Sequence, residues 1–292
     1  MREWEFWRIP LMLAPMLALI GWLFFGGLGY GLLQSLGWNP RIGNHDISLD
    51  AYYSILFSDQ HSEIFWRGLL LNLWVSILST FGAAVLALGS ALLLRQTFPG
   101  KKLATFLFQL NLPVPHVVAA IGILFVFSQS GLIARGAVQL GLMDVPKEFP
   151  VLVRDSWGIG IIISYIWKEM PFFGVIALSI LQSLGQDYED RARILGANSW
   201  QRFRYVIVPL VLPGMLSASV IVFAFTFGSY EVPALLGERF PRMLPVTAVK
   251  FFMDPDLNAR AEGMAIGIII AIIAFVLVVF YMWIGRKTIR NY

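Results

Sequence analysis

Polar side chains that could bind a solute follow the end of one apolar segment. Thr226, Ser229, Tyr230 and Glu231 stand close together just before Pro233. They supply hydroxyl groups, an aromatic ring and a carboxylate, and a cationic amine could use all three through charge pairing and cation–π contact. Alternatively, Tyr230 anchors the chain at a membrane surface and Glu231 is an ordinary surface acid. The residues alone leave both interpretations open.

Two ionisable residues lie inside another apolar segment. Lys168 and Glu169 fall near the middle of the run from Gly158 to Leu184. Charged groups at membrane depth are costly and usually face a cavity or a partner. They are therefore candidates for the wall of a solute pathway. The alternative is a structural lock, in which they pair with each other or with a neighbouring helix.

A third polar group interrupts a further apolar run. Asn111 and His116 flank Pro113 and Pro115. Prolines leave backbone carbonyl groups unpaired, which is tolerated in a membrane only where protein or a water-filled cavity receives them. Asn111 and His116 are thus further pathway candidates, but a lone His on an apolar helix is more often a packing residue. No second His or acid stands at ligand spacing, so no metal site is expected.

Six apolar runs must position these residues. With 58% hydrophobic residues, 14% charged residues and a mean hydropathy of +0.71, the chain of 292 residues has too little polar surface for a soluble globule. A spanning helix needs about 20 apolar residues. Runs of this kind extend from Ile9 to Leu33, Gly68 to Leu94, Leu103 to Phe127, Gly158 to Leu184, Leu210 to Ser229 and Gly263 to Ile284. The sequence predicts an all-α integral membrane protein with six transmembrane helices.

One membrane domain, residues 1–292, is the economical interpretation, with an N-terminal span at 9–33 and a core at 68–284. Placing both termini in the cytoplasm puts 12 of the 22 Lys and Arg residues inside, with only five of the 18 acidic residues. The positive-inside rule therefore favours an N-in, C-in orientation. The net charge of +4 reports this orientation and does not indicate nucleic-acid binding.

The longest polar segment, residues 186–209, reads QDYEDRARILGANSWQRFRYVIVP and is predicted to be cytoplasmic. A helix can begin at Asp187, supported by the pairs Asp187/Arg191 and Glu189/Arg193 at a spacing of four. Its apolar face consists of Tyr188, Ala192 and Leu195. An ordinary solvated loop is the alternative, because runs of charge are usually solvated.

A second short helix is expected in the same loop. Gly196 is placed to end the first helix in a left-handed cap, and Asn198 or Ser199 can cap a turn that carries Trp200 and Phe203. The result would be a small amphipathic helix pair with its apolar face directed away from lipid.

This loop resembles the cytoplasmic coupling loop of inner-membrane permeases in ATP-binding-cassette (ABC) importers. The family pattern is Glu-Ala-Ala, three residues, Gly, nine residues, Ile-x-Leu-Pro. The matching positions here are Asp190-Arg191-Ala192, Gly196, Val206 and Val208-Pro209. The opening Glu-Ala is replaced by Asp190-Arg191, which keeps the acid and loses the small residue. The resemblance assigns ATPase coupling to Tyr188, Glu189, Asp190, Ala192, Leu195, Gly196, Ala197 and Pro209.

The resemblance extends from Gly68 to the C-terminus. The segments NLWVSILSTFGAAVLALGSALLLR, IWKEMPFF and FGSYEVPALLG are similar to binding-protein-dependent permeases of type I importers. The stretch from Pro233 to Gly237 looks most like the polyamine subclass and its relatives for aminophosphonate, thiamine and ferric iron. A small polar or cationic solute such as a polyamine is therefore the expected substrate.

The resemblance also implies partners. They are two copies of an ATPase that carries ATP and Mg²⁺, a second and non-identical permease, and an extracytoplasmic binding protein, all at a bacterial inner membrane. The chain has no Gly-x-x-x-x-Gly-Lys-[Ser/Thr] phosphate loop, so it is expected to be no enzyme and to carry no cofactor. The outer loops at 38–64 and 128–157 are long enough for short surface helices on which a receptor could dock. A secondary transporter and a channel, each working without an ATPase, are the alternatives from other classes.

Overall fold

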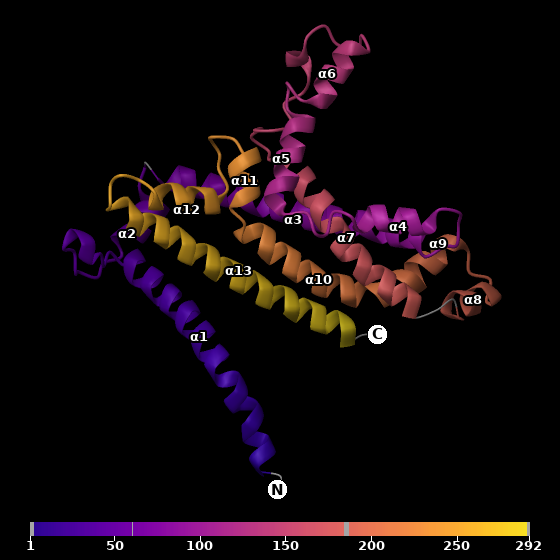
Figure 1. Ribbon diagram of the computed structural model, residues 1–292, viewed down its shortest axis with the longest axis horizontal. Coiled ribbons are helices and arrows are strands. Elements are labelled where there is room, and N and C mark those ends of the chain that lie inside the picture. The colour runs from indigo at the N-terminus through magenta and orange to yellow at the C-terminus, as the bar shows by residue number, and fades with distance from the viewer. Residues whose placement is uncertain (1–2, 60, 184–186, 291–292) are drawn as a thin grey trace. The chain divides into compact units, whose positions relative to one another are not determined.

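The computed structural model describes residues 3–59, 61–183 and 187–290, and it is helical throughout these ranges apart from turns, loops and one isolated bridge (Figure 1). Its helices are α1 Glu3–Ser35, η1 Pro40–Ile42, α2 Asp50–Phe57, α3 Ser62–Leu94, α4 Lys101–Gln109, α5 His116–Phe127, α6 Leu132–Gln139, η2 Pro146–Glu148, α7 Ile159–Ser183, α8 Asp187–Ile194, α9 Ser199–Arg202, η3 Phe203–Ile207, α10 Val208–Gly228, α11 Glu231–Leu236, α12 Leu244–Phe252 and α13 Ala259–Arg290. The predicted all-α fold is confirmed.

Six helical segments of the described chain are long and apolar enough to cross a membrane, as predicted. They are Pro10–Ser35, Ser62–Leu94, His116–Gln139, Ile159–Ser183, Ser199–Gly228 and Ala259–Trp283. Four of these agree with the sequence runs to within a few residues at most ends. The third and fifth differ, and each difference has a local cause.

The third span was predicted wrongly as one helix over 103–127. The chain forms α4, leaves the helix over residues 110–115, and begins again as α5 at His116. Pro113 and Pro115 cause this break, because proline lacks the N–H that a continuing helix needs and disfavours helical geometry in the preceding residue. The spanning candidate is therefore α5 followed by α6, with a short interruption at 128–131.

The fifth span begins earlier than predicted. α9, the π-helical turn η3 and α10 follow one another without a break, so helix extends over 30 residues from Ser199 to Gly228. The predicted loop thus contains the first turns of the span itself. Short helices were predicted in the loops at 38–64 and 128–157. They are present as η1 and α2 in the first loop and as η2 in the second, whereas α6 belongs to the third spanning candidate.

The chain divides into two compact units, one of Met1–Phe65 with Thr247–Ile269 and one of Trp66–Val246 with Ile270–Tyr292. In the first unit, hydrogen bonds join helix ends that are far apart in sequence. Ser35 Oγ lies 2.7 Å from Tyr52 Oη, and Ser54 Oγ donates to Glu262 Oε1 at 2.7 Å. These bonds connect α2 to the end of α1 and to the first turn of α13.

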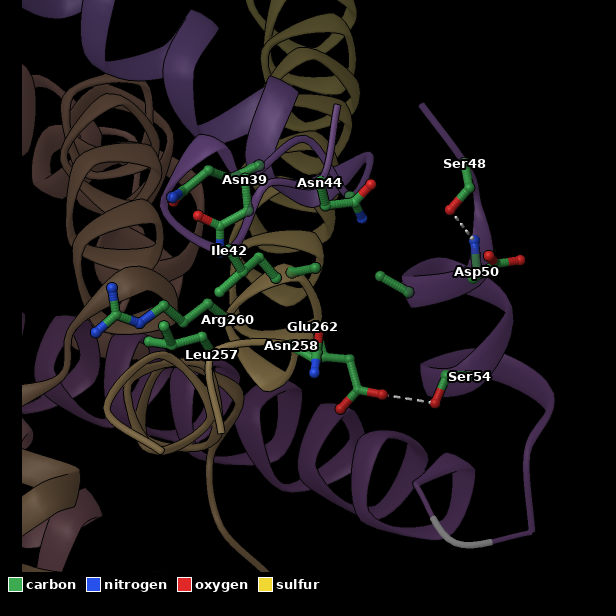
Figure 2. Close-up of a pocket in the computed structure, with 14 residues that line it drawn as sticks. Asn39, Ile42, Asn44, Ser48, Asp50, Ser54, Leu257, Asn258, Arg260 and Glu262 are labelled. Atoms are coloured by element: carbon green, nitrogen blue, oxygen red, sulfur yellow. Dashed lines mark hydrogen bonds between the residues drawn. The ribbon is translucent and has the colours of Figure 1, made fainter. Parts of the chain in front are cut away.

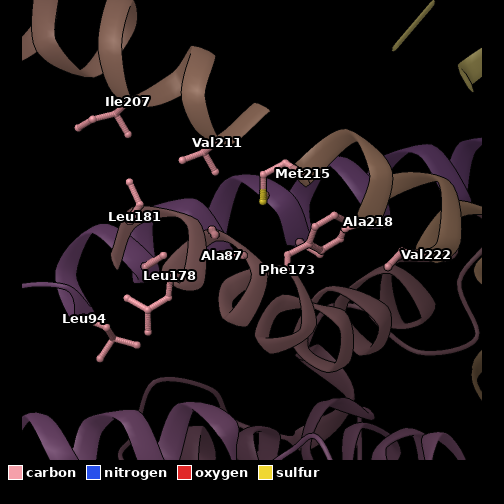
Figure 3. Close-up of a cluster of buried hydrophobic side chains, with 13 residues drawn as sticks. Ala87, Leu94, Phe173, Leu178, Leu181, Ile207, Val211, Met215, Ala218 and Val222 are labelled. Carbon is pink, nitrogen blue, oxygen red and sulfur yellow. The ribbon is translucent and has the colours of Figure 1, made fainter. Parts of the chain in front are cut away.

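The core of the second unit joins α3, α7 and α10 (Figure 3). Ala83, Ala87 and Ala91 form a fully buried stripe along α3, spaced four residues apart. Small residues let helix backbones approach, and close packing drives helix association in a bilayer because lipid tails are as apolar as Leu. Phe173 of α7 and Met215 of α10 fill the remaining space. This core supports both candidate sites described next.

Candidate functional site

The coupling loop folds as the predicted helix pair. α8 ends at Ile194, and Gly196 adopts φ +86°. The N–H of Ala197 donates to the carbonyl of Ala192 at 3.0 Å, and that of Gly196 donates to Arg193 at 3.0 Å. These two bonds form a Schellman cap, which requires a left-handed residue and therefore favours glycine.

The second helix of the pair begins with the predicted cap. Asn198 Oδ1 accepts from the N–H of Gln201 at 2.9 Å, and Gln201 Oε1 accepts from the N–H of Asn198 at 2.8 Å. This reciprocal capping box satisfies two amide groups that an uncapped helix would leave without partners. Gly196 and Asn198 together fix the turn between α8 and α9.

A π-helical turn connects this pair to the membrane span. The N–H of Val208 donates to the carbonyl of Phe203, five residues earlier. The adjacent Pro209 has no N–H to offer to Tyr205, so the α-helical ladder cannot continue unchanged here. Because helix nevertheless extends through this turn, α9 and α10 are one continuous element. Pro209 therefore lies within the helical connection between loop and span.

An ion pair attaches α8 to the end of α3. Both carboxylate oxygens of Glu189 accept from the Arg95 guanidinium, one of them at 3.0 Å from Nη2. The expected Glu189/Arg193 pair is therefore wrong, and Arg193 instead lies 3.5 Å from Asp190. The Asp187/Arg191 pair cannot be compared, because the Asp187 side chain falls outside the described residues.

The Arg95–Glu189 ion pair is stronger than the ion pairs usually found in an exposed loop. The fork of an arginine matches a carboxylate, and the two side chains are only 25% and 15% exposed. The hydrogen bonds from Arg95 lower the pKa of Glu189, in spite of the opposing effect of burial. Arg95 is one of the 12 Lys and Arg residues that the N-in, C-in orientation puts in the cytoplasm, and the sequence indicated no role for it. The available signal was that this orientation puts Arg95 and the loop on the same membrane face.

The helix pair exposes large apolar side chains. Ile194 is 84% exposed, Leu195 87%, Trp200 67% and Tyr188 50%. Of the predicted apolar face, Ala192 is half-buried while Tyr188 and Leu195 are exposed. Such a concentration of exposed apolar surface on an otherwise charged loop is characteristic of a surface that another protein covers.

The second group of candidates meets at the break before α5. Lys168 Nζ donates to the carbonyl oxygens of Asn111 and Leu112, both at 3.0 Å. In an unbroken helix the Asn111 carbonyl would accept from residue 115, which is proline. The N–H of Val114 also donates to the Asn111 carbonyl, at 3.1 Å. Lys168 therefore supplies a further donor at the break that the prolines cause. Its side chain is 7% exposed, as the structural-lock interpretation expects.

Glu169 and His116 form the other half of this joint. His116 Nε2 lies 2.8 Å from Glu169 Oε1, and the imidazole ring lies 4.6 Å from the ring of Phe225 on α10. Three elements, α5, α7 and α10, thus meet at His116. Phe225 was missed by sequence analysis, because nothing in its immediate sequence indicates a partner on another helix.

At the same joint, one buried polar atom of the Asn111 side chain has no hydrogen-bond partner in the described chain. Its Nδ2 donates to the carbonyl of Trp167, while its Oδ1 accepts from no described residue although the side chain is 7% exposed. A buried acceptor without a donor is costly unless water or a ligand supplies one. Among the four candidates at the joint, Asn111 is the one with a buried side-chain atom that has no partner in the described chain.

The last four candidates lie at and beyond the end of α10. Thr226 is fully buried and donates to its own helix, to the Val222 carbonyl at 2.9 Å. Ser229 is 8% exposed, while Tyr230 is 41% exposed and Glu231 is exposed in the first turn of α11. Tyr230 and Glu231 are the accessible members of this group.

Residues 83–290 match the family of binding-protein-dependent transport system inner membrane components. The chain belongs to this family. It is accordingly the permease component of an ABC importer and a multi-pass protein of the bacterial inner membrane. The secondary-transporter and channel interpretations are thereby set aside.

Named relatives are consistent with this assignment. The inner membrane ABC transporter permease protein YcjO of Escherichia coli (strain K12) is 26% identical over 274 residues, which are 92% of this chain and 90% of that protein. The thiamine transport system permease ThiP of Brucella suis biovar 1 (strain 1330) is 32% identical over 178 residues, 59% of this chain and 31% of its own. The thiamine relative fits the predicted subclass.

Solved structures show the same fold. A bacterial ABC transporter for the acidic polysaccharide alginate contains a chain that superposes with a TM-score of 0.77 at 21% identity, covering 98% of this chain and 99% of that one. The methionine transporter MetNI matches with a TM-score of 0.56 at 17% identity, covering 80% of this chain and 99% of that one. The predicted type I permease architecture is confirmed.

The Arg95–Glu189 pair is expected to stabilise the permease in a pH-dependent manner. Arg95→Gln and Glu189→Gln should each lower the apparent unfolding midpoint of the purified protein, and a double-mutant cycle should give a coupling energy of about 0.5–3 kcal/mol. Because the folded-state pKa of Glu189 is lowered, the contribution is complete above about pH 4.3 and is lost as the pH falls through the lowered value. Asp190→Asn, at an exposed pair, is the control. Additive effects of the two substitutions would contradict the contact.

Lys168 is expected to be needed for stability as well as for any transport role. Lys168→Met keeps the side-chain volume but removes the donor to Asn111 and Leu112. The Asn111 carbonyl keeps the N–H of Val114, whereas the Leu112 carbonyl loses its side-chain donor, and leaving such a group unpaired costs about 1–3 kcal/mol. Thermal unfolding in mild detergent measures this, with the exposed Lys102→Met as the matched control. Unchanged stability in Lys168→Met, with loss of uptake, would assign Lys168 to the solute instead.

Proposed function

We propose that this permease forms half of the solute pathway of an ATP-driven importer and receives the ATPase through residues 186–209. Two copies of a separate ATPase would bind ATP and Mg²⁺ and dock on the α8–α9 pair of each permease. A second, non-identical permease would complete the pathway, and an extracytoplasmic binding protein would deliver the solute. The methionine and alginate systems are ABC transporters of the same fold, and the alginate transporter has been solved with a periplasmic protein.

The observation that best supports the coupling role is the attachment of an exposed apolar surface to two membrane spans. Leu195 and Trp200 are exposed on α8–α9, yet α9 continues into α10 through η3 and Glu189 binds Arg95 at the end of α3. A partner that covers the apolar surface can therefore displace both spans together. A merely solvated loop would need neither the exposed apolar side chains nor the ion pair.

Alternating access follows from this attachment. α3 and α10 meet α7 in the core around Phe173, so movement of the helix pair is transmitted to the same packed cluster. Close-packed interfaces switch between discrete arrangements more readily than they deform continuously. ATP-driven approach of the two ATPases would thus change the pathway between outward-facing and inward-facing states. With N-in, C-in as the proposed orientation, the loop would lie on the ATPase side.

The substrate is proposed to be a small polar or cationic solute such as a polyamine, with aminophosphonate, thiamine and ferric iron as other candidates. Two features of the chain support a cationic substrate. Asn111 Oδ1 is a buried acceptor without a described donor, and Glu231 is an exposed acid that directly follows the exposed Tyr230 in the chain. The named relatives include permeases for thiamine and for sulfate, so they favour neither charge by themselves.

Substituting the exposed apolar residue Leu195 tests the coupling role. Leu195→Asp should abolish recovery of the ATPase when the tagged chain is extracted gently and co-purifying proteins are identified by mass spectrometry, because the charge prevents apolar docking. Leu142→Asp is the matched control, since Leu142 is 73% exposed in the loop after α6. The control should retain the ATPase. Equal recovery of the ATPase with Leu195→Asp would contradict docking at this surface.

A substitution at Glu231 tests whether this residue contacts a cationic substrate. Glu231→Gln should lower uptake of a polyamine several-fold while the complex still assembles, because the carboxylate is lost without loss of buried packing. Radiolabelled uptake into cells or vesicles measures this, with Glu238→Gln, another exposed acid, as the control. Wild-type uptake in Glu231→Gln would remove Glu231 from the pathway.

A further inference from the structure

An open cavity of about 970 Å³ lies between the end of α5, α6 and the segment around η2. All of these elements belong to the second unit. Three basic side chains line the cavity, Arg135 of α6, Lys147 of η2 and Arg154, and no acidic side chain does. All three residues are exposed, so a partner in solution can reach their charges.

The acids of the same loop do not neutralise these cations. Residues 128–157 also contain Asp144, Glu148 and Asp155. Glu148 Oε2 accepts from the N–H of Asp144 at 3.0 Å, and Asp155 accepts from two backbone N–H groups at the entry to α7, at 2.9 and 2.8 Å. In the described chain, no acid forms an ion pair with any of the three cations. The cavity therefore presents positive charge that the fold leaves uncompensated.

Hydrogen bonds hold the wall of this cavity in place. Gln129 Nε2 donates to the carbonyls of Lys147 and Phe149, at 3.0 and 2.8 Å, and so joins η2 to the end of α5. The N–H of Arg154 donates to the carbonyl of Leu236 at 2.8 Å. Arg154 has φ +61°, a left-handed conformation that is costly for a long side chain. Such a cost at a residue that lines a cavity indicates a role for its side chain.

The polar pocket of the first unit has a different character. Its wall contains both signs of charge, because Arg260 lines it together with Asp50 and Glu262 (Figure 2). Glu262 is already engaged, since the hydroxyl of Ser54 donates to its Oε1 at 2.7 Å. A wall of mixed charge selects neither sign of partner, whereas a wall with cations alone selects an acidic one.

The order of the spans indicates on which membrane face the basic cavity opens. The third spanning candidate ends at Gln139 and the fourth is Ile159–Ser183, so Lys147 and Arg154 lie between two spans. The coupling loop follows the other end of the fourth span. A helix that crosses the bilayer once has its two ends on opposite faces. The cavity therefore lies on the face opposite the coupling loop, from which a binding protein would approach.

We propose that this cavity is a docking site for an acidic surface segment of the extracytoplasmic binding protein; the inference rests on the proposed function, which supplies that partner. Carboxylates of the segment pair with Arg135, Lys147 and Arg154. Val151, which is 50% exposed on the same wall, adds apolar contact. Charge complementarity of this kind accelerates encounter and fixes the register of two proteins, and its effect decreases with ionic strength.

The first experiment uses a fluorescent oligoglutamate peptide as the probe for an acidic segment. Its anisotropy is measured against the intact permease–ATPase complex in phosphatidylcholine nanodiscs, where it should bind saturably and less tightly as salt is raised. Arg135→Gln, Lys147→Gln and Arg154→Asn should each weaken binding about two- to five-fold, and the triple variant about ten-fold or more. Asparagine tolerates the left-handed region, so Arg154→Asn removes the charge and keeps the backbone. Arg239→Gln, at an exposed cation between α11 and α12 that does not line the cavity, is the matched control and should change nothing.

The second experiment tests the partner itself. A photoreactive residue in place of Val151, in cells that contain the whole importer, should crosslink to a peptide of the binding protein that contains Asp or Glu, and the triple variant should lose this crosslink. The ATPase should co-purify with every variant. Failure of the docking site is thereby distinguishable from failure of the importer assignment, in which the wild-type chain recovers no ATPase.

Three results would overturn the docking site. One is an equal loss of peptide binding in Arg239→Gln, which would show general attraction to a basic surface. Another is binding of phosphatidylglycerol, in native mass spectrometry, that displaces the peptide and is lost in the triple variant, because an anionic lipid would then occupy the cavity. The third is a crosslink from position 151 that the triple variant retains in full.

Discussion

Within a bilayer every backbone carbonyl needs a donor from the protein, and this constraint organises the centre of the permease. The prolines between α4 and α5 remove backbone donors, and Lys168 of α7 supplies two hydrogen bonds to the carbonyls left at the break. Because Lys168 must lie there, the adjacent Glu169 is brought to His116 and His116 to Phe225. The charged residues that look like ligands are thus largely engaged in joining α5, α7 and α10. Among the buried side-chain atoms of the described joint, the one without a partner is the side-chain oxygen of Asn111.

The same core connects this joint to the coupling loop. α10 contributes Phe225 at one end of the span and continues through η3 into α9 at the other. α3 contributes Arg95 at its end and the alanine stripe along its length. A displacement of α8–α9 therefore acts on helices that also hold the joint. The arrangement lets an ATPase change the pathway through contiguous packing, without a separate moving element.

Local patterns in the sequence predicted local structure well. Gly196 and Asn198 identified the caps of α8 and α9, because capping depends on residues one to four positions apart. Six spans followed from apolar length alone. The failures came from contacts between distant residues: Glu189 binds Arg95, 94 positions away, and not Arg193. The prediction of the third span was wrong for a different reason. It followed the apolar length of the run and gave too little weight to the two prolines that divide it. N-in, C-in orientation and a single domain over 1–292 stay predictions.

The joint explains why ionisable residues can lie inside spanning helices without contacting a solute. Lys168 Nζ donates to two backbone carbonyls, and Glu169 Oε1 lies 2.8 Å from His116 Nε2, so the three side chains have partners within the fold. Charged groups at membrane depth are costly when they lack such partners. Their position in the apolar run therefore does not by itself identify a solute contact. The buried side-chain oxygen of Asn111 differs, because it has no donor in the described chain and a solute or water that reached it would add a hydrogen bond.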